Sequence, residues 1–387
     1  MEREELSAWL RLQSTPGVGN HTARRLMASF GLPQQIFDQN ATSLRLIASA
    51  AQTEALLCEP DHLPALIEST WNWLNADSQR RRILTLGDPS YPPSLLNIED
   101  PPLMLYAMGN PMYWDTLDPA HWTTRNIAVV GSRNPTAQGA INARKFSHAL
   151  TQAGLCVVSG LALGVDGAAH EGALDSAPVN SVSTIAVVGT GLDRVYPRQH
   201  RDLAHRIAQH GLILSEYPLG TPPLSANFPR RNRIIAGLSQ GTLVIEAALQ
   251  SGSLITARLA SEQGKDVFAI PGSIHATQSK GCHALIKQGA KLVESAQDIL
   301  EEWPKLGSPS TAINTIGVGT QPVRSNMQNA PEDSLLAALG FEPQGLDALL
   351  ARTGLDTATL QARLMELELD GDITRMPGGL FQRLAHG

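Results

Sequence analysis

The sequence predicts an α/β fold in which a mainly parallel sheet is covered by helices on both faces. Short β-branched runs recur from about residue 83 and mostly end at glycine, and segments with helical spacing lie between them. The runs are apolar at successive positions instead of alternating with polar residues. Continuous apolar strands that alternate with helices are typical of a parallel sheet buried on both sides.

The elements of this sheet can be placed in chain order. The expected strands are RNIAVVGS (125–132), GLCVVSG (154–160), STIAVVGTG (183–191), GLILSEY (211–217), GTLVIEA (241–247) and DVFAIPG (266–272). Helical spacing covers 138–153, 199–210 and 253–263, and LMLYAMG (103–109) reads as a strand ahead of the main alternation. Together these elements fill a central domain predicted to span residues 81–303.

Two further domains are expected to flank the sheet. Residues 1–80 read as mostly helical, and LQSTPGVGNHTARRLMASFG (12–31) resembles a helix-hairpin-helix or SAM-like element that holds a DNA phosphate; a helical turn that merely needs glycine fits as well. Residues 304–331 are rich in Gly, Pro, Ser, Thr and Asn, which predicts a flexible linker. In 332–387, two helices followed by GDITRMPGGLFQRL (371–384) predict a winged helix with a two-stranded wing.

Composition excludes some protein classes and leaves others open. The 387 residues contain no run near the roughly 18 apolar residues of a membrane span, and the acidic start MEREELSAWL lacks a signal core, so a cytoplasmic protein is expected. The net charge is −6, but residues 331–387 carry nine acidic and four basic side chains, which leaves −1 for residues 1–330. A near-neutral body can still hold a basic cleft, so nucleic acid remains a candidate partner.

The three cysteines give no sign of a metal or disulfide site. Cys58, Cys156 and Cys282 are far apart, with no CxxC and no histidine at ligand spacing. Buried free thiols in a reducing compartment are the expected state, and no metal is predicted.

The stretch NFPRRNRIIAGLS (227–239) carries the strongest charge signal. Arg230, Arg231 and Arg233 lie in a segment that has no Asp or Glu between Glu216 and Glu246. Three guanidinium groups without local partners are expected to take an anion from elsewhere. Phe228 beside them is suited to stacking on a base, as in single-stranded nucleic acid binding, although core packing explains this ring equally well.

Glycine loops follow several of the expected strands, at 131–136, 159–166, 189–197 and 239–242. In a doubly wound sheet ligands bind at these carboxyl ends, and glycine lets backbone N–H groups approach a phosphate. GTGLDR lacks the third glycine of a nicotinamide site, and no Walker A lysine loop is present. The pattern predicts an anion site without a nucleotide cofactor.

Catalytic chemistry has weaker support. Asp166 and His170 lie four residues apart, but a capping carboxylate and a hydrogen-bonded core histidine are favoured over an acid–base pair. GTLVIEA is faintly similar to a signature of nucleoside-monophosphate phosphoribohydrolases. This chain has Leu238-Ser239-Gln240 before it, where those enzymes have Pro-Gly-Gly. Glu246 in this stretch is either a buried structural anchor or a ligand contact. The predictions are therefore no catalytic residue and no cofactor, with a nucleotide-binding module or a phosphoribohydrolase-type enzyme kept as alternatives.

Five stretches together closely resemble the DNA-processing protein A family (DprA, also called Smf). They are VVGSRNPTAQG, VVSGLALGVDGAAHEGAL, VVGTGLDRVYPRQH, the run NFPRRNRIIAGLSQGTLVIEAALQSGSLITARLASEQGKDVFAIPGSI, and SKGCHALIKQGAKLV. The resemblance implies an extended Rossmann fold and a homodimer without catalytic activity. Such a protein would bind single-stranded DNA during natural transformation, protect it and load RecA recombinase. By motif, the implied DNA-binding residues are Ser132, Arg133, Ser159, Gly160, Gly189, Thr190, Gly191, Phe228, Arg230, Arg231, Asn232, Arg233 and Lys265, and the dimer and RecA surface includes Ile286 and Leu292.

The expected recognition helix of the winged domain departs from a DNA-binding pattern. DTATLQARLMELELD (356–370) contains the single base Arg363 against several acids. A helix that binds DNA needs basic side chains for the phosphates. A protein-contact role is therefore expected for this domain.

Overall fold

A nine-stranded sheet forms the centre of the computed structural model, which describes residues 1–111, 125–176, 182–303, 334–340, 343–376 and 378–384. The strand order is β1-β2-β6-β5-β4-β3-β7-β8-β9. Its strands are β1 (Arg81–Thr85), β2 (Met104–Gly109), β3 (Asn126–Val130), β4 (Cys156–Ser159), β5 (Thr184–Val188), β6 (Leu212–Ser215), β7 (Gly241–Val244), β8 (Asp266–Ala269) and β9 (Lys291–Leu292). The pairs from β6 to β9 are parallel, whereas β1–β2 and β2–β6 are antiparallel.

Helices cover both faces of this sheet, as the apolar strands predict. In β3, Ile127 and Val129 join a core with α9 (Ala137–Gln152) and α10 (Val165–Asp175). Ala128 and Val130 point the other way, into a core with α12 (Asn227–Leu238), α13 (Ser253–Glu262) and α14 (Lys280–Lys287). The remaining helices of this domain are α11 (Arg201–His210), α15 (Ala296–Glu302) and the 3₁₀ turns η1 (Pro93–Asn97), η2 (Arg198–His200) and η3 (Thr277–Ser279). The α/β prediction is confirmed.

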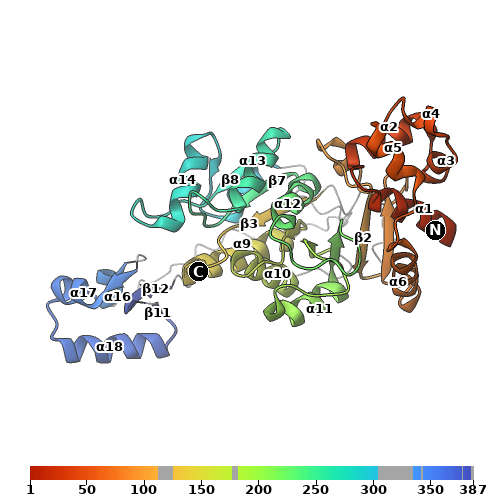
Figure 1. Ribbon diagram of the computed structural model, residues 1–387. Coiled ribbons are helices and arrows are strands. Elements are labelled where there is room, and N and C mark those ends of the chain that lie inside the picture. The colour runs from red at the N-terminus through yellow and green to blue at the C-terminus, as the bar shows by residue number, and fades with distance from the viewer. Residues whose placement is uncertain (112–124, 177–181, 304–333, 341–342, 377, 385–387) are drawn as a thin grey trace, which may run out of the picture.

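The N-terminal helices pack against one end of the sheet (Figure 1). They are α1 (Arg3–Ser14), α2 (Asn20–Phe30), α3 (Pro33–Phe37), α4 (Ala41–Leu44), α5 (Ala50–Leu57) and α6 (Leu63–Ala76). Trp9 and Leu26 belong to the same core cluster as Tyr106 of β2 and Ile213 of β6. The helices of residues 1–80 therefore share their core with the sheet.

The C-terminal residues form a winged helix. Its elements are α16 (Ser334–Leu339), β10 (Gln344–Gly345), α17 (Leu346–Thr353), α18 (Thr357–Leu369), β11 (Ile373–Met376) and β12 (Leu380–Arg383), and its sheet order is β10-β12-β11. Leu349, Leu364 and Phe381 lie in a separate small core. The predicted linker 304–331 lies outside the described residues.

Some sequence expectations need correction or addition. Cys156 and Cys282 are buried free thiols as expected, but Cys58 is exposed, because it follows the last residue of α5 at the surface. Strands β1, β9 and β10 have no counterpart among the expected runs, and two of them are only two residues long. Over the described part of the chain, no helix combines the length and apolar character needed to cross a membrane.

The buried His170 makes stability depend on pH. Its Nδ1 lies 2.7 Å from Thr184 Oγ1, and burial, with His200 and Arg231 adding to the effect, lowers the pKa of His170 to about 3. Histidine in an unfolded chain titrates near pH ~6.5, so the unfolded state binds more protons between pH ~6.5 and ~3 and stability falls as pH drops through that window. At about pH 5 this group alone should cost the folded state about 2 kcal/mol relative to neutral pH.

His170→Gln should flatten that dependence. We expect the difference in unfolding free energy between about pH 7.5 and pH 5, measured by urea denaturation, to shrink by about 2 kcal/mol. His205→Gln, at an exposed position on α11, is the matched control and should keep the parental difference. An unchanged pH dependence in His170→Gln would contradict the assignment.

Candidate nucleic-acid interface

A hollow of about 670 Å³ lies where the order of the sheet reverses, and we call it the switch-point hollow. Strand β3 is flanked by β4 on one side and by β7 on the other, and loops from all three strands contribute to the lining. Gly131, Ser132 and Arg133 follow β3, Ala162 follows β4, and 248 and 250–253 follow β7. Doubly wound sheets bind ligands at this position.

A row of two rings and a guanidinium forms one wall of the hollow. The Phe228 and Tyr196 rings are 5.6 Å apart at a tilt of 33°, and the Arg133 guanidinium lies 5.5 Å from the centre of the Phe228 ring. Arg133 is exposed and Tyr196 is 46% exposed, so both are accessible from solvent. Phe228 therefore lines the hollow and also packs against Gly189. Its ring is partly a core residue and partly a surface residue.

Arg231 forms part of the lining from beneath. Its side chain is buried, with 4% of the residue exposed, and its Nη1 donates to the Val187 carbonyl. Burial lowers the pKa of Arg231 to about 10, opposed by the carboxylate of Asp166. The guanidinium therefore keeps its charge at neutral pH, and the Asp166 side chain, which also lines the hollow, interacts with it electrostatically.

The loop after β4 is shaped around this guanidinium. A Cβ on Gly160 would lie 2.1 Å from Arg231 Nη1, so only glycine leaves room for the side chain. Asp166 Oδ2 accepts from the Gly160 and Ala162 N–H groups at 3.1 and 3.3 Å. Burial raises the pKa of Asp166, while Arg231 and these N–H groups oppose the rise. Asp166 thus fixes the loop after β4 and also lines the hollow, but it does not form the expected cap of α10, because its Oδ2 accepts from N–H groups ahead of the helix.

Other predicted residues lie around the hollow or behind it. Asn232 lines it and donates to the Gly252 carbonyl at 3.2 Å, and Arg230 is exposed one turn of α12 from Arg233. Ser132 lines it and its Oγ accepts from Asn134 N–H. Ser159, Gly189, Thr190 and Gly191 are absent from the lining; Ser159 Oγ donates to Val129 O, and Gly189 O accepts from Asn227.

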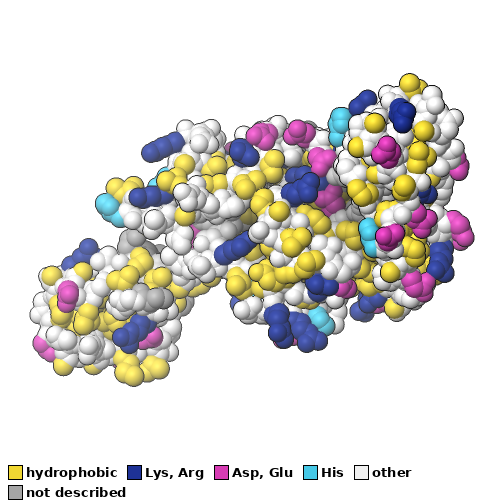
Figure 2. Space-filling view, viewed as in Figure 1, with side chains coloured by type: hydrophobic (Ala, Val, Ile, Leu, Met, Phe, Trp, Pro, Cys, Tyr) yellow, Lys and Arg dark blue, Asp and Glu magenta, His cyan; other side chains and the backbone are white. Residues whose placement is uncertain are grey.

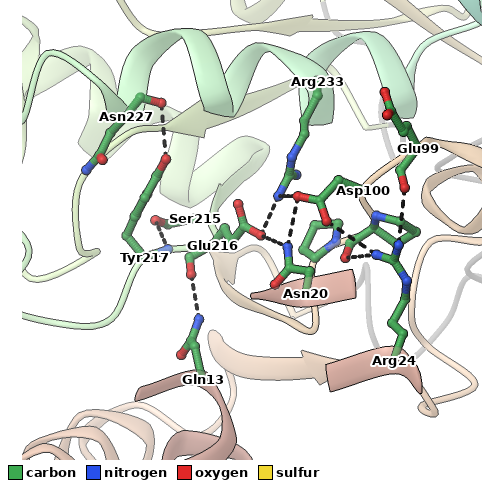
Figure 3. Close-up of polar contacts among 12 residues, drawn as sticks. Gln13, Asn20, Arg24, Glu99, Asp100, Ser215, Glu216, Tyr217, Asn227 and Arg233 are labelled. Atoms are coloured by element: carbon green, nitrogen blue, oxygen red, sulfur yellow. Dashed lines mark hydrogen bonds and ion pairs between the residues drawn. The ribbon is translucent and has the colours of Figure 1, made fainter. Parts of the chain in front are cut away.

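Arg233 has acidic partners, contrary to expectation. Its Nη2 lies 2.5 Å from Glu216 Oε1 and 3.2 Å from Asp100 Oδ2 (Figure 3). The sequence window that lacks acids begins immediately after Glu216, and Asp100 arrives from the segment before β2. The three arginines therefore do not face one hollow together: Arg231 is buried, Arg230 is exposed and Arg233 is paired.

The same carboxylates hold the N-terminal helices. Asn20 Nδ2 donates to Asp100 Oδ2 and Glu216 Oε1 at 3.1 and 3.0 Å, and Arg24 lies 3.4 Å from Asp100 (Figure 3). The start of α2, where a helix-hairpin-helix would take a phosphate, is thus docked on the sheet domain through acidic side chains.

Lys265 is not brought to the hollow. Its Nζ donates to the carbonyls of Ala236 and Gly237 at 2.7 and 2.9 Å, at the carboxyl end of α12. Desolvation lowers the pKa of Lys265 to about 8. The contacts are those of a lysine that caps a helix.

Glu246, which follows β7 in the stretch similar to phosphoribohydrolases, is also engaged. Its carboxylate accepts from Thr136 N–H at 2.9 Å and from Thr136 Oγ1 at 2.6 Å, and a Cβ on Gly139 would lie 2.4 Å from its carboxyl carbon. Burial raises its pKa, and these hydrogen bonds oppose the rise. Glu246 anchors the start of α9. Among the described residues no group of His, Cys, Asp and Glu suits a metal ion.

Comparison with protein families identifies the family that the sequence motifs resemble. Residues 82–304 match the family model described as DNA recombination-mediator protein A, and residues 321–379 match that of the DprA winged helix domain. The first match alone covers more than half of the chain. The chain belongs to the DNA recombination-mediator protein A family.

The sequences of two relatives align with this chain over most of their length. A Protein Smf from Escherichia coli is 42% identical over 81% of this chain and 80% of its own, and one from Synechocystis is 35% identical over 99% and 100%. Among solved structures, DNA processing protein A from Streptococcus pneumoniae has a TM-score of 0.60 at 36% identity, covering 78% of this chain and 98% of that one. The Helicobacter pylori family member, described for its single-stranded DNA binding mode, has a TM-score of 0.50 at 30% identity, covering 59% and 98%.

A second hollow adjoins the first and was missed by the sequence reading. Its volume is about 640 Å³, and we call it the α11 hollow; Tyr196 lines both hollows. Its other lining residues include Arg80, Arg81, Arg194, Arg198, Arg201 and His205. Figure 2 shows basic side chains gathered over α11. The motif GTGLDRVYPRQH contains residues that could have predicted this hollow, since Tyr196 and Arg198 flank its proline. Its glycines, however, favoured the prediction of a phosphate loop.

Gly160→Ala tests the arrangement beneath the hollow. The added methyl must displace the Arg231 guanidinium, so we expect a loss of about 1–3 kcal/mol of unfolding free energy in urea. Gly252→Ala is the matched control, because a Cβ there meets no atom within 4 Å and the backbone is helical. Equal stability of the two variants would show that Arg231 has room to move.

Proposed function

We propose that this chain binds single-stranded DNA in the switch-point hollow and acts as a recombination mediator without bond chemistry. The observation that carries the proposal is the row of Tyr196, Phe228 and Arg133 above the buried charge of Arg231. Rings with accessible faces stack on bases of any sequence, and neighbouring guanidinium groups bind the connecting phosphates. The Helicobacter pylori family member's single-stranded DNA binding supports this assignment.

We also propose a physiological role on the basis of the family. We infer that the chain protects single-stranded DNA that enters during natural transformation and loads RecA recombinase onto it. The family description as recombination mediators supports this role. Its expected partners are single-stranded DNA, RecA and a second copy of the chain.

The open end of the sheet supports the predicted homodimer. Among the described residues β9 pairs with β8 and with no second strand, and Leu292 on β9 is 45% exposed. Ile286 of α14 packs partly on the adjoining core. An edge strand with an exposed leucine favours pairing with another chain, so we place the dimer and RecA surface at α14 and β9.

The enzyme alternative rests on three groups, of which Asp166 lines the switch-point hollow. Asp166, His170 and Glu246 each hold structural hydrogen bonds inside the described chain. Release of free base from nucleoside monophosphates would revive a phosphoribohydrolase, and tight binding of mononucleotides without oligonucleotides would favour a nucleotide-sensing module.

Two substitutions in the switch-point hollow should weaken binding for different reasons. Arg133→Ala removes a phosphate contact, so the slope of log affinity against log salt should become shallower by about 0.7. Phe228→Ala removes stacking, so affinity should fall by about 1–3 kcal/mol with the slope unchanged. Fluorescence anisotropy with labelled oligothymidylate at several salt concentrations measures both.

Arg144→Ala is the matched control, because Arg144 on α9 pairs with Asp175 and Glu171 away from the lining. It should bind as the parent does. Parental affinity and slope in both hollow variants would refute the site. Arg231→Ala is a poorer test, since its buried side chain also supports the fold.

Leu292→Asp should separate the dimer. A carboxylate on the exposed edge strand opposes apolar contact and strand pairing, while its exposure spares the fold. Light scattering after gel filtration should show a monomer with parental thermal stability, and Leu292→Met should stay dimeric. A dimer in Leu292→Asp would move the interface elsewhere.

A further inference from the structure

Helix α18 presents an apolar and acidic face that no other described part of the chain covers. Met365 is 65% exposed and Leu369, one turn later, is 80% exposed. Glu366, Glu368 and Asp370 are exposed beside them. The one base on the helix, Arg363, is paired with Glu366 at 2.7 Å. These two adjacent apolar side chains with the acids around them make this face a candidate contact surface.

This face is unsuited to nucleic acid. Carboxylates repel phosphates, and the exposed acids of this face outnumber its one base, Arg363, which is itself paired with Glu366. The matching partner must offer apolar side chains interspersed with cations.

The rim of the switch-point hollow has this composition. Leu163, Tyr196 and Leu224 are exposed by 38%, 46% and 51%, and the two leucines are direct neighbours of the lining residues Ala162 and Pro223. Of the exposed bases, Arg133 lines the hollow, and Arg230 is the direct chain neighbour of the lining residues Pro229 and Arg231. The rim therefore complements α18 in both charge and polarity.

The covalent connection allows the two surfaces to meet. Thirty residues, 304–333, separate Trp303 from α16. Thirty residues span at most about 100 Å, whereas a 300-residue domain has a radius of gyration of about 19 Å. Because the contact is intramolecular, a weak interface is sufficient to populate it.

We propose that α18 docks on the switch-point hollow of its own chain, where Glu368 and Asp370 take the positions of DNA phosphates and Met365 and Leu369 pack on the apolar rim. The C-terminal domain then competes with single-stranded DNA for the hollow. This inference rests on the proposed function of the hollow. A domain docked nine-tenths of the time lowers the apparent DNA affinity about tenfold.

Variants of the full chain test the docking. Met365→Ser/Leu369→Ser changes no charge, and Glu368→Lys/Asp370→Lys reverses two. Each should raise affinity for labelled oligothymidylate by about three- to tenfold in anisotropy. Glu54→Lys/Glu59→Lys, two exposed acids near α5, changes net charge equally and is the control that should stay near the parent. The gain in the apolar variant cannot come from long-range electrostatics.

Hydrogen exchange supplies a second measurement. In the parent, added oligothymidylate should speed exchange in α18 at any protein concentration, and in the apolar variant α18 should exchange fast without DNA. Docking on a second copy would instead make this protection depend on concentration, which would overturn the intramolecular contact.

The outcomes separate the two proposals. If the parent binds DNA and the α18 variants bind it equally or more weakly, the docking is wrong while the proposed function stands. An equal gain in the control and the charge-reversed variant, without a gain in the apolar one, also overturns the docking. If no chain binds DNA, the proposed function fails, and the docking is then tested by hydrogen exchange at residues 223–233. Exchange there that is as slow in the apolar variant as in the parent overturns the docking.

Discussion

The burial of one guanidinium constrains the rest of the site. Arg231 is removed from water, which is costly unless nearby groups compensate its charge. The Val187 carbonyl and the Asp166 carboxylate do so, and Gly160 leaves the required space. Asp166 in turn fixes the loop after β4 through two N–H groups. A single desolvated charge thus explains the loop conformation and the glycine position beneath the hollow.

The acidic pair Asp100 and Glu216 links this site to the N-terminal helices. Both contact Arg233, from the same helix as Arg231, and both accept from Asn20 at the start of α2. Gln13 of α1 adds a hydrogen bond to the Glu216 carbonyl. A deletion of the first 80 residues would therefore leave the two carboxylates without these donors, beside α12. Truncated chains would report that disturbance together with any DNA contact of the missing helices.

Much of the fold was predictable because the central strands are continuous apolar runs, most of which end at a glycine. The positions of the charged side chains were not, because their partners are distant in sequence. Arg233 meets Asp100 across more than a hundred residues, and Lys265 turns to the end of α12. The loops that surround the hollow were expected, because ligands bind a doubly wound sheet at the carboxyl ends of its strands. Tyr196 was missed because it lies in a loop, where no sequence periodicity marks an aromatic residue as part of a site. Strand β9 was missed because two residues carry no pattern.

The side chain of Tyr196 lines both the switch-point hollow and the α11 hollow. A polymer that occupies both hollows has to pass this ring, and a bend at the ring would select for a flexible chain. Duplex DNA, with a persistence length of about 50 nm, resists such a bend, whereas an unpaired strand rotates freely about its backbone torsions. Discrimination against the double helix would then arise from mechanical compliance, without any group that reads base identity or strand count.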